Sequence, residues 1–474
     1  MNRYLFTTLP SNDLGLLTRS LPIARELAKK ENEIIFCSPG QDPSKLIMDA
    51  GFDNQLPKHP VYHLLTVEPS LPGLYEFIRS ERFKENFGNP FNFLGHLFRS
   101  LPIKMPPITS EIWNMDHISA VAGMLNKNFV RTICISLIEM IVDLEIDVVI
   151  DFWNPMACMA ARALQKPLVG VIQADVHPDS QGFIWWKEAP PDIPSPVPVI
   201  NEVLSEYSLE PIKNTGELCL GDLTLVVGMP ETDPLPANAN VTYIGAVLWQ
   251  KQSAKMPEWF DNLSEDKPVV WVYSGNPSYL PRIRTPVDSA VILHACIATL
   301  AAEDVQVVLT TGHHTLPKEL LPLPLNFCYA SYVPGLAMAE RSDLLIHHGG
   351  YGSCQTGLYA GTPAVIIPTF SERESNARRI AEVGAGEFVL PAEGSGWEKH
   401  VNTDDLRMKV RKVLSDTSYT ISARQASEKL RAYGGATAAA YLIENFSRVQ
   451  NDAQLLSNGQ RSNPACTGRD FVPR

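Results

Sequence analysis

The sequence is poor in several features that mark particular classes of protein. No stretch reaches eighteen consecutive apolar residues, and the first residues show no small-residue cleavage pattern, so we expect neither a stable membrane span nor a signal peptide. No block of lysine or arginine occurs, and the formal net charge is −12. These two features argue against a nucleic-acid partner, because its phosphates require a basic stripe on the protein.

Cysteine pairs with metal-binding spacing are also missing. The eight cysteines are scattered along the chain, and several fall inside expected strands or helices. Disulfides persist mainly in oxidising compartments. We therefore expect reduced, buried thiols, no metal site and a cytoplasmic protein.

What is present indicates a large α/β protein. The 474 residues suffice for two or three domains, each with a substantial core. Buried-strand patterns at 4–8, 34–37 and 147–150 alternate with helical patterns such as the one that begins near Leu17. This alternation predicts mostly parallel sheets, in which ligands gather at the carboxyl ends of the strands.

The most informative stretch covers residues 343–377 and reads DLLIHHGGYGSCQTGLYAGTPAVIIPTFSERESNA. An apolar strand runs through glycines into the start of a helix. Glycines let a phosphate approach the backbone, and the N–H groups of the first helical turn face it. His348 and Ser353 add donors at the same turn. The simpler interpretation is an ordinary strand-to-helix turn whose glycines allow close packing.

The order of motifs within this stretch carries a resemblance. His348-Gly-Gly-x-Gly-Ser, a later Gly-Leu-x-x-Gly-x-Pro, and Glu372-Arg373 resemble the donor-sugar signature of the UDP-glycosyltransferase-like superfamily. The resemblance implies inverting, metal-independent glycosyltransferases of the GT-B fold, which act on small molecules. That fold has two Rossmann-like doubly wound domains, an interdomain cleft and a C-terminal crossover helix. No cofactor is implied beyond the nucleotide-sugar donor, which is a co-substrate.

On this basis the chain divides into five parts. Residues 1–247 are expected to form an N-terminal acceptor-binding domain, and a polar linker follows over 248–266. Residues 267–430 would form the nucleotide-sugar-binding domain. A crossover helix at 431–446 would pack on the first domain, and 447–474 would be a mobile tail.

The resemblance also assigns the donor-binding residues. Ser274 and Gly275, in the first loop of the second domain, would approach the diphosphate. Tyr332 is expected to stack on the nucleotide base, although packing into the core is its simpler role. The full set is Ser274, Gly275, Tyr332, Val333, His348, Gly349, Gly350, Gly352, Ser353, Glu372 and Arg373.

Two departures from the family pattern bear on the donor. Thr356 stands where a glutamate usually grips both ribose hydroxyls, which leaves room for a deoxyribose donor such as a dTDP-sugar as well as a UDP-sugar. Glu372-Arg373 replaces an Asp-Gln pair that holds sugar hydroxyls. Glu372 can keep that role, whereas Arg373 either favours a carboxylated sugar or forms an ion pair with Glu372 or Glu374; we favour the ion pair.

The usual catalytic base is absent. In the family a Gly-His pair opens the first helix, and here the matching pair is Gly15-Leu16. Asp13, in the same loop, could accept the proton if burial raises its pKa, or it could be a helix N-cap. Asp151, at the end of its strand, could accept a proton itself or cap the helix that starts at Pro155.

A segment rich in phenylalanine, leucine and proline lies between the expected strands at 34–37 and 147–150, over 51–110. Aromatic insertions of this kind can line a cavity for an apolar ligand. They can equally form a lid or a satellite core, and the sequence favours neither alternative.

Together these features predict a hexosyl-type glycosyltransferase of natural-product, or secondary, metabolism. It would move a sugar from a UDP- or dTDP-linked donor to a hydroxyl of a lipophilic small-molecule acceptor. Leu16 keeps open a second interpretation, a catalytically silent homologue that binds nucleotide or a partner enzyme. A third is a sugar-nucleotide 2-epimerase, which shares the GT-B fold.

Overall fold

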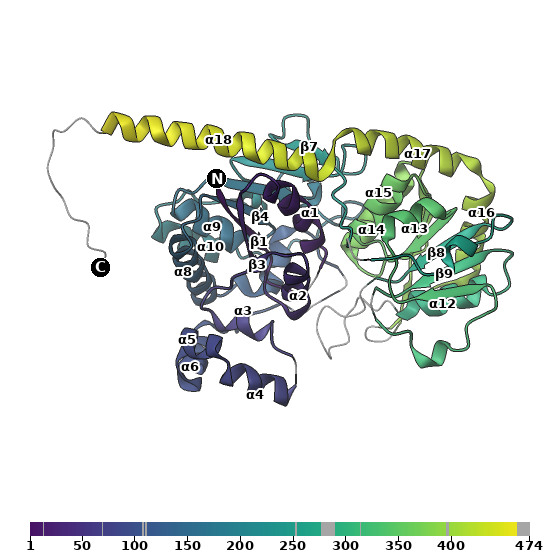
Figure 1. The fold of residues 1–474 in the computed structure, drawn as a ribbon, viewed down its shortest axis with the longest axis horizontal. Coiled ribbons are helices and arrows are strands. Elements are labelled where there is room, and N and C mark those ends of the chain that lie inside the picture. Colours follow the sequence, from purple (N-terminus) through teal and green to yellow (C-terminus); the bar gives the residue numbers. More distant parts are fainter. Residues whose placement is uncertain are drawn as a thin grey trace.

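The structure is a computed structural model that describes residues 1–12, 14–68, 70–106, 109, 111–251, 254–275, 290–312, 314–394 and 398–461. Two sheets of parallel strands, one in each half of the chain, stand side by side with helices on both faces (Figure 1). Such α/β layers arise because the strands are apolar on both faces and need cover from both sides.

Among the described residues, the first sheet has seven strands in the order β3-β2-β1-β4-β5-β6-β7. Their bounds are β1 (Arg3–Thr8), β2 (Glu33–Cys37), β3 (Asp53–Asn54), β4 (Val148–Phe152), β5 (Leu168–Ile172), β6 (Leu223–Val227) and β7 (Thr242–Gly245). The helices of this half are α1 (Leu17–Ala28), α2 (Gln41–Asp49), α3 (Pro60–Leu64), α4 (Leu71–Arg79), α5 (Glu81–Phe87), α6 (Pro90–Ser100), α7 (Met115–Ser119), α8 (Lys127–Asp143), α9 (Pro155–Ala163), α10 (Val197–Glu206) and α11 (Gly216–Cys219). Short turns of helix are η1 (Ala120–Met124) and η2 (Ala174–Val176).

The second sheet has six strands within the described ranges, in the order β10-β9-β8-β11-β12-β13. They are β8 (Val269–Tyr273), β9 (Gln306–Thr310), β10 (Phe327–Ala330), β11 (Leu344–His347), β12 (Ala364–Ile366) and β13 (Gly386–Phe388), with a small antiparallel pair β14 (Ala392–Glu393) and β15 (Lys399–His400). The helices are α12 (Ala290–Leu300), α13 (Gly335–Arg341), α14 (Tyr351–Ala360), α15 (Ser371–Glu382), α16 (Thr403–Ser415), α17 (Thr417–Ala432) and α18 (Gly435–Arg461), with η3 (Phe260–Asn262) and η4 (Lys318–Leu320).

Each sheet separates two hydrophobic clusters, as the alternation of side chains along a strand requires. In β1, Tyr4 and Phe6 join the cluster that contains residues of α1 and α18, whereas Leu5 joins the cluster that contains residues of α8 and α9. The ring of Phe6 packs on Phe36 of β2 and Phe152 of β4, with centroids 5.0 and 6.3 Å apart. Aromatic packing therefore joins the three neighbouring strands β2, β1 and β4.

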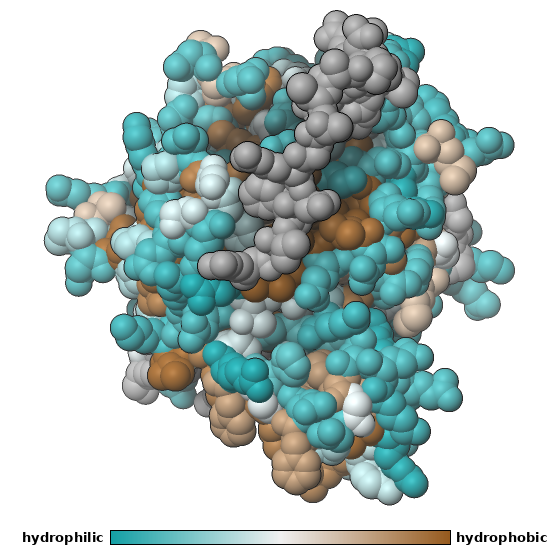
Figure 2. All heavy atoms as spheres, turned by 90° about the vertical axis from the view of Figure 1, so that its left-hand side faces the viewer, coloured by the Kyte–Doolittle hydropathy of each residue, from teal (hydrophilic) through white to brown (hydrophobic). Residues whose placement is uncertain are grey.

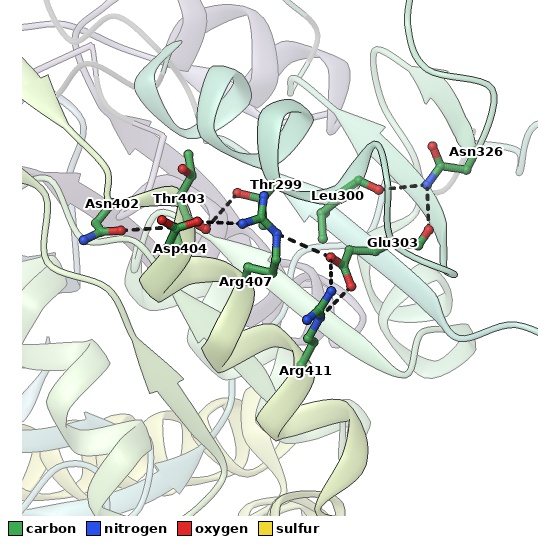
Figure 3. Close-up of polar contacts among 9 residues, drawn as sticks. All are labelled: Thr299, Leu300, Glu303, Asn326, Asn402, Thr403, Asp404, Arg407 and Arg411. Atoms are coloured by element: carbon green, nitrogen blue, oxygen red, sulfur yellow. Dashed lines mark hydrogen bonds and ion pairs between the residues drawn. The ribbon is translucent and has the colours of Figure 1, made fainter.

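In the second domain, a polar cluster ties the end of α12 to α16 (Figure 3). Glu303 accepts two hydrogen bonds of 2.9 Å from Arg411 and also pairs with Arg407 at 3.4 Å. The amide of Asn326 donates to the Leu300 carbonyl oxygen at 3.0 Å, which closes the same corner. The bidentate Arg–carboxylate geometry gives this contact more directional strength than a single surface ion pair.

The two domains are joined by a residue of the glycine motif itself. Tyr351, the first residue of α14, is buried within the hydrophobic cluster of the first domain. Its hydroxyl oxygen lies 2.5 Å from the Val227 carbonyl oxygen and 2.9 Å from Oδ1 of Asp233, which are the two acceptors for its single O–H. Gly228 is needed here, because a Cβ on it would lie 2.6 Å from the Tyr351 hydroxyl. The start of α14 is therefore held at the domain interface.

The crossover segment differs from the prediction at both ends. Helix α18 begins at Gly435 and continues to Arg461, so the crossover helix begins and ends later than predicted; the mobility expected for 447–474 stays a prediction. The helix persists because it packs along the first domain (Figure 1). Ser447 is buried and accepts a hydrogen bond of 3.1 Å from Tyr4, and Asn451 donates to Asn2 at 3.0 Å. Residues 462–474 lie outside the described residues.

Helices α4, α5 and α6 form a lobe that projects from the first domain at the lower left of Figure 1. Its centre is a small separate cluster of Phe83, Phe87 and Phe93. Phe83, Phe87 and Phe93 therefore form a satellite core, which was one of the two alternatives, whereas Phe91 and Phe98 are exposed. In the part of the chain that the structure describes, no helix combines the length and apolar character that a membrane span requires.

Candidate active site

A cavity of about 880 Å³ opens between the two domains. The first domain contributes the loop after β1 and the start of α1, and the second contributes the ends of β8 and β9, the turn before α14 and the start of α15. The carboxyl ends of the parallel strands in both sheets meet here, which is where open α/β sheets bind ligands.

The glycine turn between β11 and α14 is built around the imidazole of His348. A Cβ on Gly350 would lie 2.3 Å from His348 Nε2, and one on Gly275 would lie 2.6 Å from its Nδ1. Gly275 and Gly349 also have φ values of 83° and 87°, which side chains other than glycine rarely adopt. Gly275 and Gly350 therefore seat the ring, and Gly349 lets the Arg373 backbone approach, since a Cβ on it would lie 2.7 Å from the Arg373 carbonyl oxygen.

Gly352 differs from these three glycines. It lies in the first turn of α14, is exposed and borders the cavity, and a Cβ on it would meet no atom within 4 Å. No side-chain hydrogen bond caps α14 at Gly350. The helix thus presents its N-terminal end and an open space to the cavity, an arrangement that suits an anion close to the backbone. Ser353 borders the same space.

His348 is poised to act as a neutral hydrogen-bond donor. Burial, aided by the Arg373 cation, lowers the pKa of its imidazole well below the usual value, while a hydrogen bond with the Tyr273 backbone opposes this change. A neutral imidazole carries one N–H, so the Tyr273 backbone oxygen and a ligand oxygen are alternative acceptors for it. Ser274, by contrast, is buried at the end of β8 and is not among the residues that line the cavity.

One wall of the cavity is aromatic. Tyr332 and Val333 line it, as the sequence predicted for the base-binding residues. Trp271 and Tyr273 of β8 line it as well, with rings 6.1 Å apart and tilted by 27°. The Trp271 indole donates to Thr310 at 2.9 Å, which fixes its plane. Sequence reasoning missed these two residues, although their i, i+2 spacing in a strand already places them on one face.

Glu372 and Arg373 both border the cavity at the start of α15. Glu372 accepts a hydrogen bond of 3.0 Å from Asn376, and burial raises the pKa of its carboxyl, an effect that Arg373 and Arg19 oppose. Glu374 pairs instead with Arg378 at 2.7 Å. The Arg373 cation acts on the Glu372 carboxyl through its field, while its Nη1 donates to Thr369 Oγ1 at 3.0 Å; an ion pair with Glu372 stays a prediction.

Arg19 is a further cavity residue that sequence reasoning missed. It is buried on α1, one turn after Leu16, and its Nε donates to the Gly15 carbonyl oxygen at 3.0 Å. Its guanidinium lies 5.7 Å from the Trp153 ring centroid and 5.1 Å from that of Tyr351. The sequence signal that could have identified Arg19 is an arginine among the apolar positions of the first helix. Its cation contributes to the field at Glu372.

Only one of the two aspartates that were proposed as bases lies within the described residues. Asp13 lies outside the described residues; Ser11 and Leu14, on either side of it, line the cavity. Asp151 is fully buried and does not line the cavity. Its carboxylate accepts from Thr7 Oγ1 at 2.5 Å and from the Asn154 backbone N–H at 3.0 Å, and burial raises its pKa to about 6.

The role that this geometry gives Asp151 is structural. The N-cap of α9 is Asn154, whose side chain accepts from the Ala157 backbone N–H at 3.3 Å. Asp151 holds the backbone of that cap through the Asn154 N–H. The helix-capping alternative is thus favoured in a modified form, in which Asp151 supports the cap and Asn154 provides it.

Two more carboxyl groups, those of the half-buried Asp175 and the buried Asp233, are influenced by Arg379 of α15. Ser375 donates to Asp175 Oδ2 at 3.1 Å, and the indole of Trp185 donates to Ser375 at 3.1 Å. Burial raises the pKa of Asp175 to about 7; the Asp233 and Glu372 carboxylates reinforce this change and the Arg379 cation opposes it. Burial likewise raises the pKa of Asp233 to about 6.

The raised pKa of Asp175 predicts how stability depends on pH. The folded protein binds this proton more tightly than the unfolded chain, so the contribution to the free energy of unfolding falls as pH rises from about 4 to about 7. Asp175→Asn should therefore be more stable than wild type at about pH 8, by roughly 1–2 kcal/mol, and the difference should shrink toward pH 4. Urea unfolding at several pH values measures this. The exposed neighbour Asp179→Asn is the matched control, and an equal pH slope for Asp175→Asn and wild type would contradict the prediction.

The described residues contain no cluster of three His, Cys, Asp or Glu side chains arranged to hold a metal ion. The groups able to hold a ligand are instead the helix start of α14, His348, Ser353 and the aromatic wall. This set of donors and rings fits a nucleotide with a diphosphate.

Comparisons with solved structures define the class of fold. The chain aligns over 94% of its length with VinC, a glycosyltransferase crystallised in complex with dTDP, with a TM-score of 0.61 and 18% identity over 99% of that chain. It aligns equally with CalG4, the calicheamicin glycosyltransferase, with a TM-score of 0.63, 18% identity and 98% of that chain covered. The protein has the GT-B fold of these glycosyltransferases, and the fold predicted from the sequence is confirmed.

Sequence comparisons match parts of the chain to one domain family and to named proteins. Residues 294–440 match the family described as erythromycin biosynthesis protein CIII-like, C-terminal domain. The chain is 31% identical over 190 residues to 4′-demethylrebeccamycin synthase of Lentzea aerocolonigenes, which is 40% of this chain and 41% of that protein. It is 30% identical over 211 residues, 44% of each chain, to a PGL/p-HBAD biosynthesis glycosyltransferase of Mycobacterium tuberculosis. The matches thus span about two fifths of these relatives. The resemblance to the UDP-glycosyltransferase-like superfamily is confirmed.

Proposed function

We propose that this protein transfers a sugar from a nucleoside diphosphate to a hydroxyl group of a lipophilic small molecule. The observation that carries the proposal is the open N-terminal end of α14 at the interdomain cavity, beside His348 and an aromatic wall. The chain matches about two fifths of the length of two relatives, which are named 4′-demethylrebeccamycin synthase and PGL/p-HBAD biosynthesis glycosyltransferase. VinC was crystallised in complex with dTDP.

The donor would lie with its base against Tyr332 and Trp271 and its diphosphate at the glycine turn. Thr356 also borders the cavity, and its hydroxyl donates to the Gly352 carbonyl oxygen at 2.8 Å. A neutral side chain here in place of a carboxylate makes a dTDP-sugar as suitable a donor as a UDP-sugar. A thymidine diphosphate complex is also known for SpnG, a spinosyn rhamnosyltransferase that shares the fold.

The reaction that fits this arrangement is a single displacement with inversion. The acceptor oxygen attacks the anomeric carbon, the bond from that carbon to the diphosphate oxygen breaks, and the acceptor proton passes to a carboxylate, for which we propose Asp13. Charge develops on the departing diphosphate. The α14 terminus, His348 and Ser353 would stabilise that charge in place of a metal ion or other cofactor.

A transfer assay tests the proposal. Purified protein is incubated with UDP- and dTDP-sugars and a panel of phenolic, macrolide and lipid alcohols, with and without a chelator, and the products are analysed by mass spectrometry and by the anomeric NMR coupling. We expect an inverted glycoside whose yield the chelator does not change. An epimerised donor in the absence of acceptor would instead indicate an epimerase. Nucleotide binding with neither transfer nor donor hydrolysis would indicate a silent homologue.

A further inference from the structure

The lobe of the first domain contains a short repeat that the donor site does not use. Residues 71–80 read LPGLYEFIRS and residues 91–100 read FNFLGHLFRS. Each begins with a large apolar residue, has others at its fourth, seventh and eighth positions, and ends in Arg-Ser. Positions one, four and eight lie on one face of a helix. The two segments coincide with α4 and α6.

Both helices are apolar on two sides. The inner side packs into the small core of the lobe, through Phe77 of α4 and Phe93 of α6. The outer side faces solvent. Leu71 is 84% exposed, Phe91 85% and Phe98 68%. The other exposed apolar residues of this surface are Leu74, Tyr75, Leu94, Leu101, Ile103 and Met105. We call these nine residues the lobe face.

The lobe face is separate from the cavity. No described residue of 51–110 borders the cavity between the domains. Figure 1 shows the lobe projecting away from α18 and from the second domain. Figure 2, seen from the left side of Figure 1, shows tan and brown apolar atoms gathered at the bottom of the molecule, where the lobe lies. A lobe that exposes nine large apolar side chains is a candidate interaction site.

The charges around the lobe face indicate the kind of partner. Residues 71–105 contain five Lys or Arg against three Glu, within a chain of net charge −12. Arg79 and Arg99 each directly follow the last apolar position of their helix, and both are exposed. The Arg79 guanidinium lies 5.0 Å from the Tyr75 ring centroid. Lys104 stands between Ile103 and Met105.

An apolar helical face bordered by arginines fits the surface of a lipid bilayer. Phenylalanine and leucine side chains enter the acyl boundary, while arginine stems extend to the headgroup phosphates. A local excess of cations favours anionic lipids. A second copy of the chain is the alternative occupant, and the experiment below distinguishes it from a bilayer.

We propose that the lobe face binds the surface of a bilayer that contains anionic lipids. Binding would be peripheral, through α4, α6 and residues 101–105. It would hold the cavity near a phase in which a lipophilic acceptor concentrates; that consequence rests on the proposed function, whereas the binding itself does not.

Co-sedimentation of the full chain with phosphatidylcholine vesicles, with and without phosphatidylglycerol, tests the proposal. We expect wild type to bind, and more strongly when phosphatidylglycerol is present. Phe91→Ser/Phe98→Ser should lower the partition coefficient by at least about tenfold. The matched control is Met408→Ser/Ile421→Ser, two residues 60% and 54% exposed on α16 and α17 of the other domain, which should bind like wild type. Arg79→Gln/Arg99→Gln should lose the preference for phosphatidylglycerol.

The replaced side chains are exposed, so folding should be unchanged, and thermal unfolding followed by circular dichroism verifies this for each variant. Failure of the proposed function would abolish transfer without affecting vesicle binding, so the two results are distinguishable. Equal vesicle binding by wild type and Phe91→Ser/Phe98→Ser would overturn the proposal. Wild type that stays in the supernatant would also overturn it. Dimers that form without lipid and that the double variant abolishes would overturn it too, since they would assign the lobe face to a second copy.

Discussion

His348→Ala is expected to lower kcat/KM for sugar transfer by about 10²- to 10³-fold. The imidazole is held neutral by burial and by the Arg373 cation, and Gly275 and Gly350 fix its orientation toward the cavity. We expect its single N–H to turn from the Tyr273 backbone to a diphosphate oxygen when the donor binds, because negative charge grows there in the transition state. Initial rates measure the loss, and calorimetric titration with UDP and dTDP separates ground-state affinity from turnover.

Two further variants make this result specific. His400→Ala removes an exposed histidine from β15, away from the cavity, and should behave like wild type. His348→Asn keeps a side-chain N–H and should recover part of the lost rate. Thermal unfolding shows whether His348→Ala has merely opened a void among its glycines. Unchanged affinity and rate in a folded His348→Ala protein would exclude the donor site described above.

The local patterns of the chain were enough to predict the fold and the glycine turn. Parallel strands with helices between them leave a clear alternation, and the order of motifs from His348 to Glu372 lies within one short stretch. In such cases the physics is local: a strand needs apolar residues, and a turn that holds an anion needs glycines. The structure places Tyr332, Val333, His348, Ser353 and the Glu372-Arg373 pair around one cavity.

What could not be predicted depends on partners far along the chain. Tyr351 reads as part of the glycine motif, yet its hydroxyl binds Asp233, which is 118 residues away. Arg19 reads as one helical arginine among several, and only the assembled cleft places it near Glu372. The segment after 446 reads as a polar tail, because the contact of Ser447 with Tyr4 joins residues at opposite ends of the chain. Local composition carries no trace of such contacts.

The loop after β1 is where the catalytic base should be found. Leu16 lines the cavity at the position of the usual histidine and cannot accept a proton. Asp151 is enclosed by Thr7 and Asn154, away from the cavity. Ser11 and Leu14 line the cavity on either side of Asp13, which makes Asp13 our proposal for the base. Asp13→Asn should lower kcat by about 10²- to 10⁴-fold, with donor affinity unchanged.

Asp151→Asn provides the control for this prediction, because it removes a carboxylate of the same domain that lies outside the cavity. It should keep its turnover per folded molecule but lose about 1–3 kcal/mol of stability, since an amide cannot accept both hydrogen bonds that the buried carboxylate accepts. The pH profile adds a second readout: an aspartate base is active only when ionised, so wild-type kcat should fall on the acidic side, and Asp13→Asn should lose that limb. Full turnover in Asp13→Asn would rule this residue out and direct attention to Glu372, whose carboxyl borders the cavity and has a raised pKa.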